Sequence, residues 1–110
     1  FSEKVSFETG KSELVSAADS ILAITVRMLN YNPEAKCRIE GHTDDVGNAR
    51  DNLLLSQNRA KAVATALKNR GIPAAVQLEV KGYGSTKPIN SNSSAEGKAM
   101  NRRVDIIIEK

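Results

Sequence analysis

The fold is decided by residues 37–71, which read CRIEGHTDDVGNARDNLLLSQNRAKAVATALKNRG. At the start of this stretch, apolar Cys37 and Ile39 alternate with charged neighbours, and the alternation continues to Gly41. Alternation with a period of two is typical of a strand that is buried on one face. We therefore expect a strand over residues 37–41, with Cys37 as a small core residue, followed by a polar loop over residues 41–47.

The second half of the same stretch predicts a helix. Ser56 is expected to act as its N-cap, and Leu55 and Ala60 are placed to form a hydrophobic staple. Gly71 stands where a left-handed C-cap is wanted, with Pro73 just beyond it. The helix should bury one apolar stripe, formed by Ala60, Val63, Ala64 and Leu67.

Upstream of this stretch, the sequence predicts one more strand and one more helix. Val5 and Phe7 alternate with polar residues, which indicates a short strand. Ser16 is a candidate N-cap with Asp19 in a capping-box position, and the apolar spacing that follows favours a helix over residues 17–31. This helix should stop before Pro33, because the residue before a proline disfavours helix.

Downstream, alternation over residues 76–81 predicts a third strand, and residues 104–109 predict a fourth. Between them lies a long polar stretch with a short helical turn expected over residues 94–100. An additional apolar residue, Ile107, indicates that the last strand is central and covered on both faces. The order β-α-β-α-β-loop/short helix-β predicts an α/β two-layer sandwich with two main helices packed on a four-stranded mixed sheet.

Length and composition narrow the possible classes of protein. With 110 residues, 40% of them hydrophobic and 26% charged, we expect residues 1–110 to form a single domain excised from a larger protein. The single cysteine excludes an intrachain disulfide, and no apolar run approaches the ~18 residues that span a bilayer. A net charge of +3 with only four aromatic residues (two Tyr and two Phe) argues against a nucleic-acid partner.

Asp44 and Arg59 are the strongest candidates for ligand binding. Asp44 follows the carboxyl end of the second predicted strand, where open α/β folds gather ligands, and Arg59 should lie in the first turn of the next helix. An arginine is unfavourable against the helix dipole unless an anion sits between them. A carboxylate at Arg59 and an ammonium at Asp44 would make a receptor for a zwitterion. The alternative is that the two side chains form a surface salt bridge. In either case we expect a partly exposed site whose substitution changes stability little.

Other polar residues are less informative. His42 is the single histidine, and no nucleophile motif or second histidine accompanies it, so we expect a loop histidine satisfied by backbone hydrogen bonds. The run Asn101-Arg102-Arg103 either contacts an anion or forms a strand entry in which Asn101 ties down the preceding loop. We expect no catalytic residue, no metal and no cofactor.

Taken together, four segments resemble the OmpA-like C-terminal domain, a peptidoglycan-binding family. Residues 5–14 resemble its opening strand and turn, and residues 41–60 fit its pattern GHTD-x-x-G-x(4)-N-x-x-LS-x-x-RA. Residues 82–84 with Pro88 resemble its third-strand exit, and residues 101–104 resemble its terminal NRRV. Four pieces in order, at compatible spacing, cover nearly the whole chain.

The resemblance implies non-covalent binding of peptidoglycan through the diaminopimelate of the stem peptide. It implies that Asp44 receives the ammonium and Arg59 the carboxylate. The residues that would shape or border the pocket are Thr43, Asn52, Leu55, Thr9 and Arg102 or Arg103. Asp51 departs from the family, because many relatives carry an aromatic residue there. The implied location is the periplasmic face of a Gram-negative outer membrane, with any membrane anchor outside these residues.

Two other functions remain open from the sequence. A cell-wall hydrolase would need an activated nucleophile with a base or a metal set, and a nucleic-acid-binding domain would show binding that falls steeply with salt. The parent protein also stays open, since barrel-linked proteins, lipoproteins and flagellar stators all carry this domain.

Overall fold

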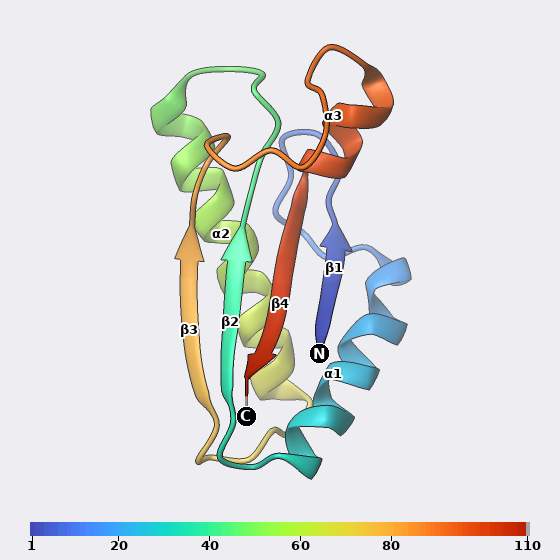
Figure 1. Ribbon diagram of the computed structural model, residues 1–110, viewed down its shortest axis with the longest axis vertical. Helices are drawn as coiled ribbons and strands as arrows, with labels where there is room; N and C mark the ends of the chain where they lie inside the picture. The colour runs from blue at the N-terminus through green and yellow to red at the C-terminus, as the bar shows by residue number, and fades with distance from the viewer. Residues whose placement is uncertain (110) are drawn as a thin grey trace.

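Four strands form one mixed sheet in the computed structural model, which describes residues 1–109 (Figure 1). The elements are β1 (Ser2–Ser6), the 3-10 helix η1 (Ser16–Ala18), α1 (Asp19–Tyr31), β2 (Lys36–Gly41), α2 (Ala49–Asn69), β3 (Gln77–Gly82), α3 (Ala95–Asn101) and β4 (Arg103–Glu109). None of the described helices has both the length and the apolar composition needed to cross a membrane.

The sheet order is β1-β4-β2-β3. Strand β4 runs antiparallel to both β1 and β2, whereas β2 and β3 are parallel. Helices α1 and α2 lie on the same face of this sheet, and α3 lies beyond one end of it (Figure 1). The predicted fold class, a two-layer α/β sandwich on a four-stranded mixed sheet, is confirmed.

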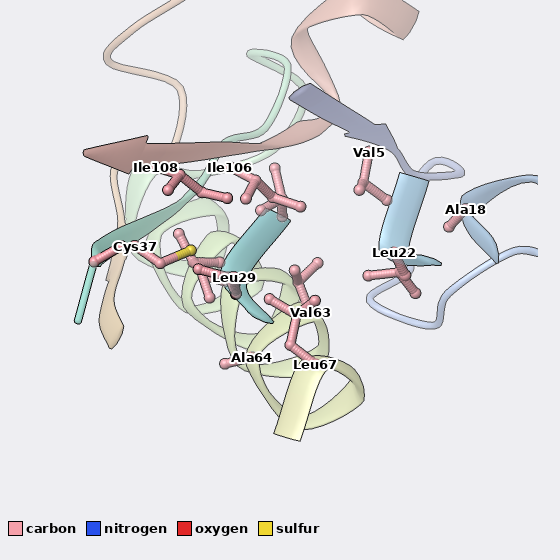
Figure 2. Packing of buried hydrophobic residues seen from close by; sticks show 14 of the residues in the cluster. Val5, Ala18, Leu22, Leu29, Cys37, Val63, Ala64, Leu67, Ile106 and Ile108 are labelled. Carbon is pink, nitrogen blue, oxygen red and sulfur yellow. The ribbon is translucent and has the colours of Figure 1, made fainter. Parts of the chain in front are cut away.

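The hydrophobic core lies between the sheet and the two long helices (Figure 2). Cys37, Ile106 and Ile108 from the sheet are buried together with Leu29 of α1 and Leu67 of α2. Burial raises the pKa of the Cys37 thiol to about 11, so it stays protonated and inert at neutral pH. Its predicted role as a small core residue is confirmed.

The prediction that both faces of the last strand are covered is wrong. Strand β4 is indeed central, but the helices cover only the face that carries Val104, Ile106 and Ile108. Ile107 points to the outer face and is half-buried there. The register places charged residues, among them Arg38 and Asp105, on that same face.

The predicted start of the second helix is also wrong. Helix α2 begins at Ala49, and the side chain of Asn48 caps it by accepting a 2.8 Å hydrogen bond from the Asp51 amide. Ser56 therefore lies inside the helix, and no staple forms around it. At the other end, Gly71 has φ 87°, which confirms the left-handed C-cap.

Helix α1 begins without the predicted capping box. Ser16 opens the short 3-10 helix, and Ala18 precedes α1 without any side-chain cap. The helix ends at Tyr31, just before the Asn32-Pro33 pair, as predicted. The short helix after the polar stretch is α3, capped by Ser94 at Gly97.

Two glycines bring α2 unusually close to the sheet. A Cβ on Gly41 would lie 1.9 Å from the backbone oxygen of Ser56, and a Cβ on Gly82 would lie 2.5 Å from the backbone nitrogen of Gln57. Only glycine tolerates such an approach of two backbones. The glycines thereby hold the first half of α2 against the carboxyl ends of β2 and β3.

Candidate functional site

A cavity of about 320 Å³ is lined by residues from the loop after β2 and from the start of α2. Figure 1 shows that β2 ends and α2 begins at the same end of the molecule. Its walls come from the loop after β1, the loop after β2, the first three turns of α2 and Arg102 between α3 and β4. The residues that line it are Thr9, Gly10, Thr43, Asp44, Val46, Gly47, Asp51, Asn52, Leu55, Arg59 and Arg102. The structure therefore brings together every predicted site residue except Arg103.

The Arg59 side chain connects the segments that surround this cavity. It is fully buried, and its guanidinium donates to three backbone carbonyls: Nε to Lys11 at 2.8 Å, Nη1 to His42 at 2.9 Å and Nη2 to Glu8 at 3.0 Å. A guanidinium carries five N–H groups, so one remains on Nη1 and one on Nη2. Two such neighbouring donors match the two oxygens of a carboxylate.

This geometry corrects two expectations about Arg59. Because α2 starts at Ala49, Arg59 lies well inside the helix and not in its first turn, so the helix dipole does not bear on it. The side chain is also buried, not partly exposed. Burial lowers the pKa of Arg59 to about 10; the charge of Asp44 opposes this shift and that of Arg102 adds to it. The guanidinium still carries its charge at neutral pH.

Asp44 pairs with a different arginine from the one predicted. Its Oδ2 lies 3.2 Å from Nη1 of Arg102, and its Oδ1 accepts a hydrogen bond from the Val46 amide. Among residues 1–109, no direct ion pair joins Asp44 to Arg59, so the salt-bridge alternative is wrong. Both carboxylate oxygens of Asp44 face partners that belong to the rim of the cavity.

The loop that carries Asp44 is fixed on several sides. Thr43 donates its hydroxyl to the Asp44 carbonyl at 2.7 Å, and the Thr43 amide donates to the Gly84 carbonyl at 2.9 Å. The Nδ2 of Asn52 lies 3.5 Å from the same Asp44 carbonyl, a weak contact from the side of α2. The charged groups are therefore held in place before any ligand arrives.

Arg103 lies elsewhere. Its Nε donates to Asp105 at 3.0 Å and its Nη2 to the Lys87 carbonyl at 3.1 Å, both away from the residues that line the cavity. Asn101 is fully buried and accepts from the amides of Ile89 and Asn90, so its predicted role in tying down the preceding loop is confirmed. Of the two arginines, Arg102 is the one that lines the cavity.

Sequence reasoning missed the backbone contribution to the site. The carbonyls of Glu8, Lys11 and His42 hold Arg59, and a carbonyl carries no residue-type signal. The prediction for His42 is correct only for its backbone: the amide donates to the Arg103 carbonyl and the carbonyl accepts from Arg59, but the ring lies against a carboxylate, with Nε2 3.3 Å from Oδ2 of Asp105.

Gly10, Val46, Gly47 and Asp51 also line the cavity although they were not predicted to. Gly47 was available as a signal, since it belongs to the matched pattern and has φ 91°, which few other residues adopt.

The cavity offers one kind of chemistry clearly. It places a buried guanidinium with spare donors near a carboxylate, and it is lined by no histidine, cysteine or serine side chain. Such a site can bind a molecule that carries both a carboxylate and an ammonium.

Comparison with known proteins gives consistent matches. A model of the OmpA family matches residues 6–102. The outer-membrane lipoprotein YfiB of Pseudomonas aeruginosa is 38% identical over 107 residues, which cover 97% of this chain and 63% of that protein. The peptidoglycan-binding protein ArfA of Mycobacterium tuberculosis is 38% identical over 104 residues, 94% of this chain and 32% of that protein.

The crystal structure of the peptidoglycan-associated lipoprotein from Burkholderia pseudomallei superposes with a TM-score of 0.90 at 30% identity. The match covers 96% of this chain and 89% of that one. This chain thus accounts for most of that structure, but for less than two thirds of YfiB and about a third of ArfA.

Proposed function

This chain belongs to the OmpA family, and from that premise we propose that it binds peptidoglycan non-covalently and cleaves nothing. Two of the similar proteins are named for peptidoglycan, ArfA as a binding protein and the Burkholderia lipoprotein as an associated one. The proposed role is to anchor a larger protein to the cell wall.

The ligand group we propose is the diaminopimelate of the stem peptide. The observation that carries this proposal is the buried Arg59, which keeps one N–H on each of two terminal nitrogens while Asp44 lines the same cavity. The side-chain end of diaminopimelate carries one carboxylate and one ammonium. Arg59 would hold the carboxylate through two parallel hydrogen bonds, and Asp44 would hold the ammonium.

Arg102 has a defined part in this proposal. Without ligand it neutralises Asp44 across 3.2 Å. An arriving ammonium competes for that carboxylate, and the ligand carboxylate gives Arg102 a new anionic neighbour. The cavity therefore exchanges one set of charge pairs for another, and no charge is left uncompensated.

Thr43, Asn52, Leu55 and Thr9 would shape the walls around this group. The absence of cleavage is supported by the lining of the cavity, where the hydroxyl of Thr43 is engaged with a backbone carbonyl. The proposed location is the periplasm next to the outer membrane, by analogy with YfiB.

A binding assay on intact sacculi tests the proposal. The protein should be retained by sacculi that contain diaminopimelate and should pass through sacculi with lysine in the stem, because lysine lacks the second carboxylate. Asp44→Ala should abolish retention, whereas Asp45→Ala, which changes an exposed neighbour, should not.

Three results would count against this function. Equal retention by both kinds of sacculi would remove the diaminopimelate assignment. Release of soluble muropeptides would indicate a hydrolase. Retention of Asp44→Ala at the level of the native chain would mean that another surface makes the contact.

A further inference from the structure

We propose that this chain pairs with a second copy of itself through the open edge of β3, so that two four-stranded sheets join into one. In the sheet order β1-β4-β2-β3, strand β3 has one neighbour, β2, and no strand lies on its other side (Figure 1). The backbone N–H and C=O groups of an open edge lack partners, and another strand can pair with them. The inference does not depend on the proposed function, because no residue of β3 lines the cavity that contains Arg59.

The hydrogen bonds of β3 to β2 determine which of its residues face the open edge. The amides of Gln77 and Tyr83 donate to backbone carbonyls on the β2 side, at 3.0 Å and 2.9 Å. Successive amides in a strand point to opposite sides, so the odd-numbered residues of β3 bond toward β2. The N–H and C=O groups of Leu78 and Val80 therefore point toward the open edge. Val80 is 40% exposed, so nothing in the described chain covers this part of the edge.

The charges on β3 favour one antiparallel register. In a symmetric pair of antiparallel strands, the residue at the two-fold axis lies opposite its own copy. With the axis at Val80, Glu79 of each copy lies opposite Lys81 of the other, and such opposite charges attract across a strand pair. An axis at Glu79 would place two glutamates opposite each other, and an axis at Lys81 would place two lysines opposite each other. Like charges in that position destabilise a pair, so of these registers only the axis at Val80 is complementary.

Both charged side chains are available to a second copy. Glu79 and Lys81 are exposed. Lys81 forms no ion pair among residues 1–109, and its ammonium lies 5.0 Å from the centroid of the Tyr83 ring. Glu79 contacts Lys36 at 3.1 Å through Oε1 alone, which leaves Oε2 for another cation. A surface pair of this kind contributes little to stability, so it does not oppose the new contact.

An apolar groove beside the same edge adds contact area. The groove, of about 490 Å³, lies between α2 and β3 and is lined by Leu53, Gln57, Lys61, Val80, Lys81 and Gly82. Leu53 is 44% exposed, so it and Val80 present apolar surface to solvent next to the unpaired backbone. A second strand along this edge would cover both side chains, and removal of their apolar surface from water would strengthen the pairing.

Pairing about this axis would give a dimer with two well-separated cavities. The axis passes through the middle of β3, whereas the cavity is lined from the end at which β2 finishes. Because the two β3 strands run in opposite directions, the two cavities would lie at opposite ends of the joined sheet. On the premise of the proposed function, such a dimer would hold two stem peptides at once and bind sacculi more tightly than a single domain.

Sedimentation equilibrium of the chain from micromolar to millimolar concentration tests the proposal. Edge pairing buries little area, so we expect a weak dimer, with a mass that rises with concentration toward twice 11.9 kDa. Glu79→Lys and Lys81→Glu should each weaken self-association at least about tenfold, because each places like charges opposite each other on both sides of the axis. An equimolar mixture of the two variants should associate again, because every glutamate then lies opposite a lysine.

Glu13→Lys is the matched control for these charge reversals. It makes the same change in charge at an exposed acid in the loop after β1, away from the open edge, and it should associate like the native chain. Val80→Pro tests the backbone separately from the charges. Proline removes an N–H that the single copy leaves unpaired, so an edge strand can accept it. We expect an unchanged circular dichroism spectrum and no self-association.

Three results would overturn the proposal. The first is a native chain that stays monomeric at millimolar concentration, which would leave the edge to a strand of another protein. The second is self-association at native strength in Glu79→Lys and Lys81→Glu, and the third is failure of their mixture to associate. Stem-peptide binding by the isolated domain should be the same in Glu79→Lys as in the native chain, so the dimer and the proposed function can fail independently.

Discussion

Arg59 is a buried charged group, and three backbone carbonyls replace most of its hydration. Two of these carbonyls belong to the loop after β1 and one to the end of β2. The residue therefore binds separate parts of the chain to α2 as well as facing the cavity. If the proposed function holds, structure and ligand recognition depend on the same side chain.

Arg59→Lys should lose both functions. Lysine keeps the charge but cannot donate to three divergent carbonyls in one plane. We expect retention on sacculi to be lost and the free energy of unfolding to fall by about 1–3 kcal/mol, because buried carbonyls lose their partners. Urea unfolding and the sacculus assay measure the two effects separately.

The matched control for this variant is Arg27→Lys on the exposed surface of α1, which should change neither quantity. Native stability in Arg59→Lys would show that the carbonyls find other partners. Native retention would show that Arg59 acts only as a point charge.

Because of Asp105, the free energy of unfolding should decrease at acid pH. Burial alone would raise the pKa of this carboxyl, but its contacts with His42, Arg103 and Lys4 outweigh burial and hold the pKa at about 2. At pH values above the pKa of this carboxyl in the unfolded chain, near 3.8, its lowered pKa stabilises the native state. This contribution is lost as the pH falls toward 2. We expect a loss of about 2 kcal/mol over this range.

Unfolding of the native chain and of Asp105→Asn at a series of pH values checks this. The difference in stability between them should be largest above pH 4 and should shrink toward pH 2. A difference that does not depend on pH would mean that the Asp105 carboxyl titrates normally.

At the scale of single residues, the sequence predicted the charged groups of the site but not which groups they contact. Asp44 and Arg59 were recognised as a pair in one site, and the structure places both on one cavity. That Asp44 faces Arg102 instead depends on β4 running beside the loop after β2, which local sequence does not encode.

At the scale of elements, the start of α2 shows where sequence patterns fail. Asn48 and Ser56 are both good N-caps, and the choice depends on whether residues 49–55 are helical. Leu53 and Leu54 are both largely exposed, so the apolar residues of this segment show no helical stripe. A helix that packs on a sheet is normally recognised by its apolar face. Here the helix backbone instead lies directly against Gly41 and Gly82, so this part of α2 needs no apolar face.

Gly41→Ala should therefore be severely destabilising. Its Cβ would lie 1.9 Å from the backbone oxygen of Ser56, and a helix backbone cannot move aside cheaply. We expect a loss of about 3 kcal/mol or more, at the upper end for overpacking, measured by chemical unfolding.

Gly71→Ala is the control, because its Cβ meets no atom within 4 Å and only the left-handed backbone opposes it. That variant should lose about 1 kcal/mol. Similar losses in the two variants would mean that the approach of α2 to β2 is not tight.

At the scale of the whole molecule, the chain is elongated, with extents of 40 × 24 × 21 Å, and the cavity lies at one end. The order of strands and helices, and the mixed sheet that follows from it, could be predicted from strand alternation and helical apolar spacing, although both predicted helix N-caps were wrong. The site could be placed at the carboxyl ends of the strands by a general rule of α/β folds. Its walls, drawn from four separated segments, required the tertiary structure.

Because these segments meet only through the folded site, ligand binding should protect them together from hydrogen exchange. A diaminopimelate-containing stem peptide held by Arg59 and Asp44 would oppose any opening that separates the loop after β1 from α2. At a free concentration 100 times Kd, the exchange of such amides should slow about 100-fold. The Lys11 amide, bonded to the Glu8 carbonyl, and the Thr43 amide, bonded to the Gly84 carbonyl, report this directly.

The amide of Ala35 supplies the internal control, because it lies in the turn after α1 at the far end of the molecule and bonds only to the Asn32 carbonyl. It exchanges through local opening and should be unaffected by ligand. In Arg59→Lys the protection of Lys11 and Thr43 should disappear. Protection of Ala35 equal to that of Lys11 would instead mean that ligand stabilises the chain only against global unfolding, and that the cavity segments do not open as a unit of their own.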